Sequence, residues 1–160
     1  MAGRLFAWLA VIGLILGLTG FYHVLTQRDS SIIETVGENG NSVVSLQRDR
    51  TGHFLAQGLI NGHGVMFLVD TGATDVAVSE AAAREMGLKF GPRITVMTAA
   101  GPSPAWRTRL DQVSIGSLAL NNVRAVITPG LGNKVLLGMS FLQYFDWRQE
   151  GDRLVLEAGK

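Results

Sequence analysis

The chain has 160 residues, with 14 Lys and Arg against 13 Asp and Glu, and 47% of its residues are hydrophobic. This length fits one ordinary domain. There is no cysteine, which excludes a disulfide framework, a thiol nucleophile and a thiolate metal site. Arg4 is the only charged residue among residues 1–27. The rest of the chain therefore has balanced charge, which argues against nucleic acid as a partner.

Residues 5–24 form a stretch of twenty residues without formal charge, apart from a neutral histidine. About twenty helical residues span a bilayer core that is roughly 30 Å thick, so residues 1–27 are predicted to be an N-terminal membrane anchor. Trp8 and Tyr22 stand near the two ends, as interfacial aromatic residues do. Arg4 favours a cytoplasmic amino terminus. We therefore expect a single-pass protein of the cytoplasmic (inner) membrane whose following domain lies in the periplasm.

Two alternatives remain open for this apolar stretch. A cleaved secretory signal normally has an apolar region of about 7 to 15 residues that ends in small residues of the Ala-x-Ala kind. Here the stretch is longer and lacks such an ending. A buried core helix is the other alternative. A cleaved signal would export the domain just as an anchor would.

Residues 28–42 are polar and contain a cluster of Gly, Asn and Ser, which is typical of loops and linkers. We predict a polar linker here and a single domain over residues 43–160. Short β-like runs separated by turn residues dominate this domain. The first three runs, at residues 43–48, 53–60 and 65–69, predict a β-meander. Further strands are expected at residues 93–98, 107–115, 123–128, 135–137 and 153–157.

One convincing helix is predicted, over residues 79–86. Ser79 can cap its first turn, Glu80 suits its positive end, and Gly87 ends it. One helix among many strands indicates a mainly β fold.

The most informative stretch is an apolar run that ends abruptly in Asp70, Thr71 and Gly72. A carboxylate at the end of a buried strand loses its hydration, so it must be paired or hydrogen-bonded. Gly72 allows neighbouring N–H groups to turn towards that carboxylate, and the Thr71 hydroxyl can bond to structure behind it. The simpler interpretation of an isolated Asp-Thr-Gly is a turn in which the Asp70 side chain bonds to the following backbone.

The order of several motifs changes that interpretation. In chain order these are Asp70-Thr71-Gly72-Ala73, a helix with Ala83 followed by Gly87-Leu88, the segment Thr98-Ala99-Ala100-Gly101, and Val135-Leu136-Leu137-Gly138. With this order and spacing, residues 43–158 resemble the retropepsin-like aspartic proteases. The form Gly138-Met139-Ser140-Phe141-Leu142 looks like the membrane-anchored bacterial branch of that family.

The resemblance implies a mainly β, single-lobe closed barrel with one or two short helices, the second at residues 139–145. The N-terminal membrane helix precedes this barrel in the chain. It implies a hydrolase that cleaves peptide or protein substrates and needs neither a cofactor nor a metal. Asp70 is the expected catalytic residue. Support of the active-site loop is expected from Thr71, Gly72, Ala73, Leu137 and Gly138. Contact with substrate, in part through a closing flap, is expected from Thr74, Asp75, Thr98, Ala99, Ala100 and Gly101.

Viral members of the family carry a salt bridge next to this loop. In those members two Asp residues follow the Ala of Asp-Thr-Gly-Ala, and an Arg follows the apolar-apolar-Gly motif. Here the corresponding residues are Thr74, Asp75 and Met139. We therefore expect this salt bridge to be absent.

A single Asp-Thr-Gly motif is not sufficient for the peptide hydrolysis that aspartic proteases carry out. Peptide hydrolysis by this route needs two carboxylates that share a proton, one to take a proton from water and one to donate to the scissile carbonyl. No acidic residue after Asp70 is followed by Thr-Gly or Ser-Gly. A homodimer with its two-fold axis through the site would supply the second Asp70. The alternative is a catalytically silent binding or scaffolding module of the same fold on the cell envelope.

Other candidate motifs are weaker. His53 and His63 lack the helical spacing and the acidic neighbour of a zinc protease motif. No serine lies in a Gly-x-Ser-x-Gly elbow. Arg107 and Arg109 alternate along a predicted strand and are interpreted as a solvated face.

Overall fold

The computed structural model describes residues 32–37, 40–132 and 134–159. The predicted membrane anchor, residues 1–27 with its apolar stretch 5–24, lies outside the described residues and stays a prediction. No helix within the described ranges is long and apolar enough to cross a membrane.

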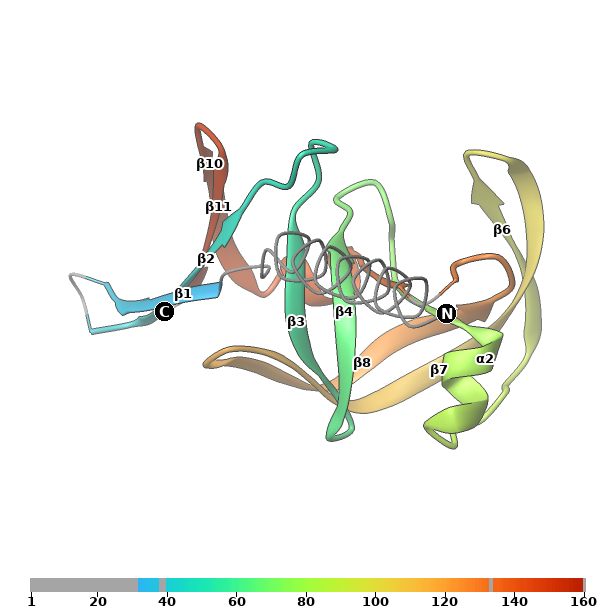
Figure 1. Cartoon of the computed structure of the whole chain (residues 1–160). Helices are drawn as coiled ribbons and strands as arrows, with labels where there is room; N and C mark the ends of the chain where they lie inside the picture. Colours follow the sequence, from blue (N-terminus) through green and yellow to red (C-terminus); the bar gives the residue numbers. More distant parts are fainter. Residues whose placement is uncertain (1–31, 38–39, 133, 160) are drawn as a thin grey trace, which may run out of the picture.

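Within these ranges the chain forms strands almost throughout, with two short helices, which confirms the prediction of a mainly β fold (Figure 1). The elements are β1 (Ile32–Val36), β2 (Ser42–Gln47), β3 (Leu55–Ile60), β4 (His63–Val69), β5 (Val76–Ser79), α2 (Glu80–Glu85), β6 (Arg93–Thr98), β7 (Gly101–Ile115), β8 (Leu118–Thr128), β9 (Lys134–Leu137), α3 (Met139–Leu142), β10 (Phe145–Glu150) and β11 (Arg153–Ala158).

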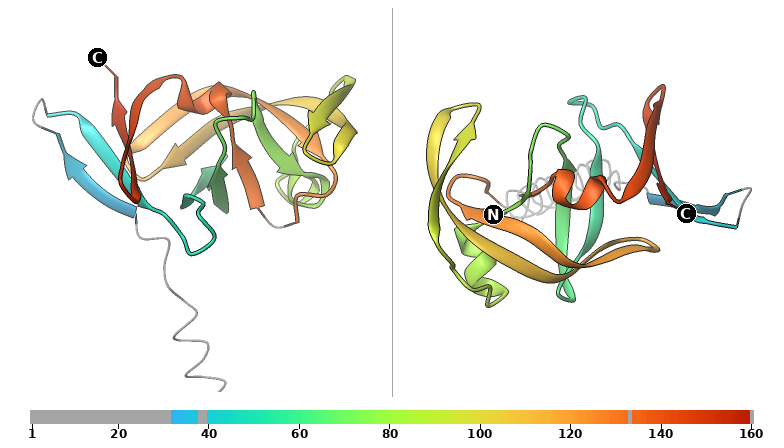
Figure 2. Two further views of the ribbon diagram at one scale, coloured as in Figure 1. Left: turned by 90° about the horizontal axis from the view of Figure 1, so that it is seen from above. Right: turned by 180° about the vertical axis from the view of Figure 1, so that it is seen from behind.

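Six strands close into a barrel in the order β3-β4-β9-β5-β8-β7. The closure is an antiparallel pairing of β3 with β7, in which Ile60 lies opposite Val113. β6 pairs only with the first part of β7. The β6–β7 hairpin stands at one end of the molecule, opposite the sheet that contains β1, β2, β10 and β11 (Figures 1 and 2). The closed-barrel prediction is confirmed.

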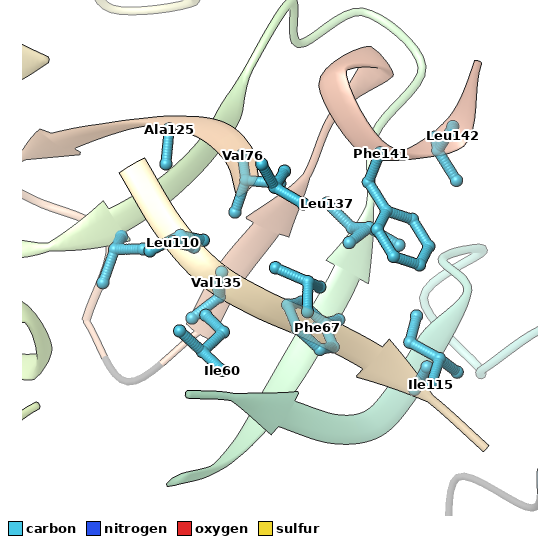
Figure 3. Close-up of a cluster of buried hydrophobic side chains, with 14 of the residues drawn as sticks. Ile60, Phe67, Val76, Leu110, Ile115, Ala125, Val135, Leu137, Phe141 and Leu142 are labelled. Atoms are coloured by element: carbon cyan, nitrogen blue, oxygen red, sulfur yellow. The ribbon is translucent and has the colours of Figure 1, made fainter. Parts of the chain in front are cut away.

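Two parallel pairings inside the barrel bring distant segments together. β9 lies between β4 and β5 and runs parallel to β4, while β5 runs parallel to β8. Strands that are covered on both faces are apolar throughout, and all four residues of β5 are buried. The side chains of Phe67, Leu137 and Phe141, from β4, β9 and α3, point into one buried cluster (Figure 3). The core therefore sits directly beneath the carboxyl ends of β4 and β9.

Four antiparallel strands form a second sheet in the order β1-β2-β11-β10. β1 falls within residues 28–42, where the sequence predicted a polar linker, so this part of the prediction is wrong. Ile32, Ile33 and Val36 are β-branched residues that favour strands, and β1 pairs with β2 along its whole length. The predicted meander is also split between sheets. β2 belongs to the second sheet, and a single bridge between Arg48 and Phe54 links it to the start of the next strand.

Several element boundaries differ from the predicted ones. The helix predicted at residues 79–86 is α2, with Ser79 as its N-cap, where the Ser79 Oγ accepts from the Ala82 N–H at 3.2 Å. The helix expected over residues 139–145 is shorter, because Phe145 begins β10 and pairs with β11. The sequence reasoning missed β5 and β10 altogether. It also assigned β7 and β8 later starts than they have.

Candidate active site

Asp70 follows β4 directly, just as Gly138 follows β9. The two strands are parallel neighbours, and their last residues, Val69 and Leu137, are register partners. The Asp70 N–H donates to the Leu137 carbonyl oxygen at 3.1 Å. Because the carboxyl ends of parallel neighbours lie at the same edge of a sheet, Asp70 and Gly138 leave the barrel side by side. Segments almost seventy positions apart in the sequence meet at this point.

The Asp70 carboxylate has one hydrogen-bond partner among the described residues. Its Oδ1 accepts from the Gly72 N–H at 2.9 Å, and the Ala73 N–H donates to the Asp70 carbonyl at 3.2 Å, which closes a tight turn. The side chain is half-buried at the rim of the barrel. An ionised carboxylate can accept about four hydrogen bonds, so this group retains capacity for a water molecule or a second acid.

Backbone contacts from the start of α3 support the Asp70 loop from behind. The Met139 N–H donates to the Ala73 carbonyl at 2.8 Å, and the Ser140 N–H donates to the Thr74 carbonyl at 2.9 Å. A Cβ on Gly138 would overlap the Asp75 carbonyl oxygen and would lie 2.7 Å from that of Ala73. Only glycine fits this close approach. Gly138 therefore lies against residues 73–75 of the loop, and Leu137 contacts Asp70 itself.

Ser140 is a buried polar residue that ties the loop to the barrel. Its hydroxyl donates to the Arg124 carbonyl at 2.7 Å and accepts from the Val76 N–H at 3.0 Å. The Ser140 hydroxyl thereby connects the backbone at the start of β5 with that of β8. The sequence reasoning considered Ser140 only as a motif residue and as a rejected nucleophile candidate, and it missed this role. The signal was a small hydroxyl residue in the first turn after the apolar-apolar-Gly motif.

The viral salt bridge next to this loop is absent, because Met139 carries no charge where viral members have an Arg. Asp75 instead has an ion pair with Arg124 of β8, with Arg124 Nε 3.5 Å from Asp75 Oδ1. The Oδ1 atom is buried and has no hydrogen bond within the described part of the chain. This contact is therefore an electrostatic pairing without hydrogen-bond geometry. No sequence pattern singles out Arg124.

A cleft of about 750 Å³ lies between the Asp70 loop and the β6–β7 hairpin. Its walls include seven of the residues predicted to support the loop or contact substrate, namely Gly72, Ala73, Thr74, Asp75, Thr98, Ala100 and Gly101. The other five predicted site residues do not line it, namely Asp70, Thr71, Ala99, Leu137 and Gly138. Sequence reasoning missed several apolar lining residues, namely Val96, Met97, Val126, Leu131 and Leu136. The cleft therefore has many apolar lining residues and is bordered by Gly72, the hydrogen-bond partner of the Asp70 carboxylate.

The tip of the hairpin is a two-residue turn between Thr98 and Gly101. The Thr98 hydroxyl donates to the Gly101 carbonyl at 2.7 Å and accepts from the Ala100 N–H at 3.2 Å. Gly101 has φ +106°, a conformation that side chains rarely adopt. Met97 beside the tip is 80% exposed. The tip thus carries its own hydrogen bonds and presents an apolar side chain to solvent.

Comparisons with known proteins agree with this geometry. The family model described as gag-polyprotein putative aspartyl protease matches residues 56–144, more than half of the chain. The structure is similar to the crystal structure of a retropepsin-like aspartic protease from Rickettsia conorii, with a TM-score of 0.63 and 30% identity. The similarity covers 80% of this chain and 96% of that one. The chain belongs to the retropepsin-like aspartic protease family.

Two uncharacterized bacterial proteins are also relatives of this retropepsin-like chain. One, encoded in the cobV 5′ region of a Sinorhizobium species, is 35% identical over 114 residues, or 69% of this chain and 49% of that protein. The other, from Rickettsia prowazekii (strain Madrid E), is 34% identical over 119 residues, or 71% of this chain and 50% of that protein. The chain thus spans about half the length of the curated relatives it matches.

In this family member β4, β9 and α3 converge on the Asp70 loop. Within the described part of the chain, no group of three His, Cys, Asp or Glu side chains could hold a metal ion. The catalytic, supporting and substrate-contacting roles expected of the predicted residues stay predictions. The fold supplies their arrangement. The Asp70 carboxylate lies on a loop that α3 supports from behind, and a cleft separates this loop from the β6–β7 hairpin.

Proposed function

We propose that the protein is an aspartic endopeptidase that hydrolyses peptide bonds with two Asp70 carboxylates, one from each copy in a homodimer. The single observation that carries this proposal is the placement of Asp70. Its carboxylate accepts one hydrogen bond, from the Gly72 N–H, and Gly72 lines a cleft of about 750 Å³. Membership of the retropepsin-like aspartic protease family supports the same reaction class.

The reaction uses the two carboxylates in complementary protonation states. The ionised Asp70 takes a proton from a water molecule, whose oxygen attacks the scissile carbonyl carbon, while the protonated Asp70 donates to the carbonyl oxygen. The resulting tetrahedral intermediate collapses as the C–N bond breaks, and the proton taken from water passes to the leaving nitrogen. The Asp70 that gave its proton to the carbonyl oxygen recovers it as the new carboxylic acid forms.

The second carboxylate is proposed to come from a second copy, because the chain has no other Asp-Thr-Gly. Asp75, the nearest acidic residue in the sequence, is already paired with Arg124. Two-fold association makes the two Asp70 loops equivalent. In this arrangement Thr71 would link the two loops across the axis and Gly72 would meet the substrate backbone. Thr98 to Gly101 would then close over the peptide.

We further propose that residues 5–24 anchor the protein in the cytoplasmic membrane, with the protease domain in the periplasm. The uncharged length of this segment and Arg4 beside it support this topology. An anchor would confine both copies to one plane and raise their effective concentration. Protease added to intact spheroplasts should digest residues 43–160 of the full chain. Digestion only after lysis would contradict this orientation.

The decisive experiment measures peptide cleavage by the full chain, purified in detergent, with a peptide mixture and mass spectrometry. Asp70→Asn should lower kcat/KM by at least about 10²- to 10⁴-fold, the usual contribution of general acid–base catalysis. Asp146→Asn is the matched control, because Asp146 is exposed on β10, and it should retain activity. Cleavage that survives Asp70→Asn would remove the aspartic mechanism. Peptide binding without cleavage by the unmodified chain would favour the catalytically silent binding module.

Two further measurements test the shared site. Excess Asp70→Asn chains mixed with unmodified chains should suppress activity, because mixed dimers lack one carboxylate. Activity that stays proportional to the unmodified chain would mean that each monomer is complete. The dependence of kcat/KM on pH should be bell-shaped with an acidic optimum, because only the singly protonated pair is active.

A further inference from the structure

A second groove, of about 700 Å³, lies beside the cleft and is rich in cationic side chains. We call it the basic groove. Its floor is formed by β7 and β8, and one wall by the segment that follows α2. Its charged lining residues are Lys89, Arg107, Arg109, Asp111, Arg124 and Asp75. Four cations thus face two carboxylates, so the groove has an excess of positive charge although residues 28–160 as a whole have balanced charge.

The positive charges are concentrated in spite of an electrostatic cost. Arg109 of β7 lies directly opposite Arg124 of β8 in the antiparallel register, and like charges in such pairs are destabilising. Arg109 Nη1 donates to the Asn122 side-chain oxygen at 2.9 Å, a neutral acceptor. Within the described part of the chain, neither Lys89 nor Arg107 has an ion pair. The groove therefore offers cations with unused capacity for an anionic partner.

The wall of the basic groove is fixed to its floor. The Gly91 N–H donates to the Arg107 carbonyl at 3.0 Å, and the Arg107 N–H donates to the Pro92 carbonyl at 3.0 Å. A Cβ on Gly91 would lie only 2.6 Å from the Arg107 carbonyl oxygen, so the two segments approach as closely as glycine allows. Lys89, two residues before Gly91, is thereby held on the same groove as Arg107.

The basic groove is continuous with the cleft beside Asp70. Asp75 lines both. On β6, Ile94 lines the basic groove and Val96 lines the cleft. Residues two apart on a strand share one face and are separated by about 6–7 Å. An extended peptide in the cleft would therefore reach the basic groove within a few residues of the scissile bond.

We propose that the basic groove binds an acidic side chain of the peptide substrate, at a position outside the residues that flank the scissile bond. This inference rests on the proposed peptidase function and adds a substrate class to it. The sequence had suggested only a solvated face for Arg107 and Arg109. The structure adds Lys89 and Arg124 from other elements, the fixed wall, and the continuity with the cleft. In a symmetric dimer each end of the substrate would meet one such groove.

The test uses two peptides that differ only in having Glu or Gln at the third to fifth positions from the cleaved bond. Fluorescence anisotropy measures their binding to full-length Asp70→Asn protein, and kcat/KM measures their cleavage by the unmodified chain. The Glu peptide should bind about tenfold more tightly, as expected for charge-assisted hydrogen bonds. Added salt should reduce the difference. The combined change Arg107→Gln and Arg109→Gln should bring the Glu-to-Gln ratio close to one.

The matched control is Arg50→Gln with Arg153→Gln, two exposed arginines outside the groove. It removes the same charge and should leave the Glu-to-Gln ratio unchanged. Arg107→Glu should shift the preference towards a peptide with Lys at the same positions.

The two proposals fail in different ways. Cleavage of both peptides at equal rates by the unmodified chain, with equal binding, would overturn the acidic subsite and leave the peptidase intact. Absence of cleavage for every peptide would overturn the peptidase, while binding to Asp70→Asn protein would still decide the subsite. A third outcome is that the unmodified chain shows no preference between the two peptides but binds phosphatidylglycerol vesicles, with this binding lost in the Arg107 and Arg109 variant. That result would overturn the subsite in favour of a membrane contact.

Discussion

Asp49 and Asp70 begin turns with the same local hydrogen bond but have different surroundings. Asp49 Oδ1 accepts from the Thr51 N–H at 2.8 Å, and Asp70 Oδ1 accepts from the Gly72 N–H at 2.9 Å. Each bond joins a side-chain oxygen to the backbone two residues later, which is the geometry of an Asx turn. The local motif alone therefore does not distinguish a structural turn from a candidate catalytic loop.

The remaining contacts make the difference. Asp49 also accepts from the Thr51 hydroxyl at 2.7 and 2.9 Å and from the His53 N–H at 2.9 Å. These hydrogen bonds lower the pKa of Asp49 below 3.8, and the bond from the His53 N–H contributes most, followed by the one from the Thr51 hydroxyl. Asp70 has one such partner among the described residues, and its loop is supported from behind by α3. A carboxylate with spare acceptor capacity on a supported loop is suited to chemistry, whereas a fully bonded one stabilises its turn.

Among changes outside Asp70 itself, the largest expected effect comes from Gly138→Ala, which breaks the support behind the Asp70 loop. The new Cβ would collide with backbone carbonyls of Ala73 and Asp75, and neither can move without shifting the loop. We expect unfolding free energy to fall by about 1–3 kcal/mol and kcat/KM by about a hundredfold. Urea unfolding and peptide cleavage measure the two effects. Gly64→Ala is the control, because a Cβ there meets no atom within 4 Å, and equal losses in both variants would contradict this argument.

Ser140→Ala tests the connection between the same loop and the barrel. The change leaves the Val76 N–H and the Arg124 carbonyl without their side-chain partner. Because the site is buried, stability should fall by about 1–3 kcal/mol, with a smaller loss of activity than in Gly138→Ala. Thermal unfolding provides the measurement. Ser117→Ala, at an exposed turn, should be close to neutral, and a neutral Ser140→Ala would show that Ser140 does not position the loop.

Local patterns explain which parts of the structure could be predicted from the sequence. Apolar runs and turn residues predicted the barrel strands other than β5, and the resemblance to the retropepsin-like family implied that Gly138 supports the Asp70 loop. The contacts of Ser140 could not be predicted, because its bond to Val76 spans 64 positions. The ion pair of Asp75 with Arg124 depends in the same way on the parallel pairing of β5 with β8. β1 was missed because polar residues around it resemble a linker.

Thr98 in the β6–β7 hairpin also accepts a hydrogen bond from the N–H two residues later, as Asp49 and Asp70 do. Loss of the Thr98 hydroxyl should have a moderate effect on activity. Thr98→Val keeps the β-branched shape but removes the bonds to Gly101 and Ala100. Since the site is exposed, stability should change by less than about 0.5 kcal/mol. If the tip closes over substrate, kcat/KM should fall several-fold. Thr95→Val, at an exposed position on the same strand, is the control. Identical kinetics in both variants would argue against a role for the tip.

The smallest effect is expected at Asp49, where the hydrogen bonds stabilise a surface turn and no chemistry depends on them. Because folding lowers the pKa of Asp49, its stabilising contribution is complete above about pH 3.8 and disappears as pH falls through the lower folded-state pKa. Asp49→Ala should therefore lower the melting temperature slightly at pH 7, and the difference from the unmodified chain should shrink below pH 3.8. Thr51→Val, which keeps the carboxylate but removes the hydroxyl donor, should lower the melting temperature by less. Activity should be unaffected in both variants. A difference that grows as the solution becomes more acidic would have the wrong sign for a carboxylate whose pKa is lowered, and a loss of activity would mean that the two aspartate turns are not as different as their surroundings indicate.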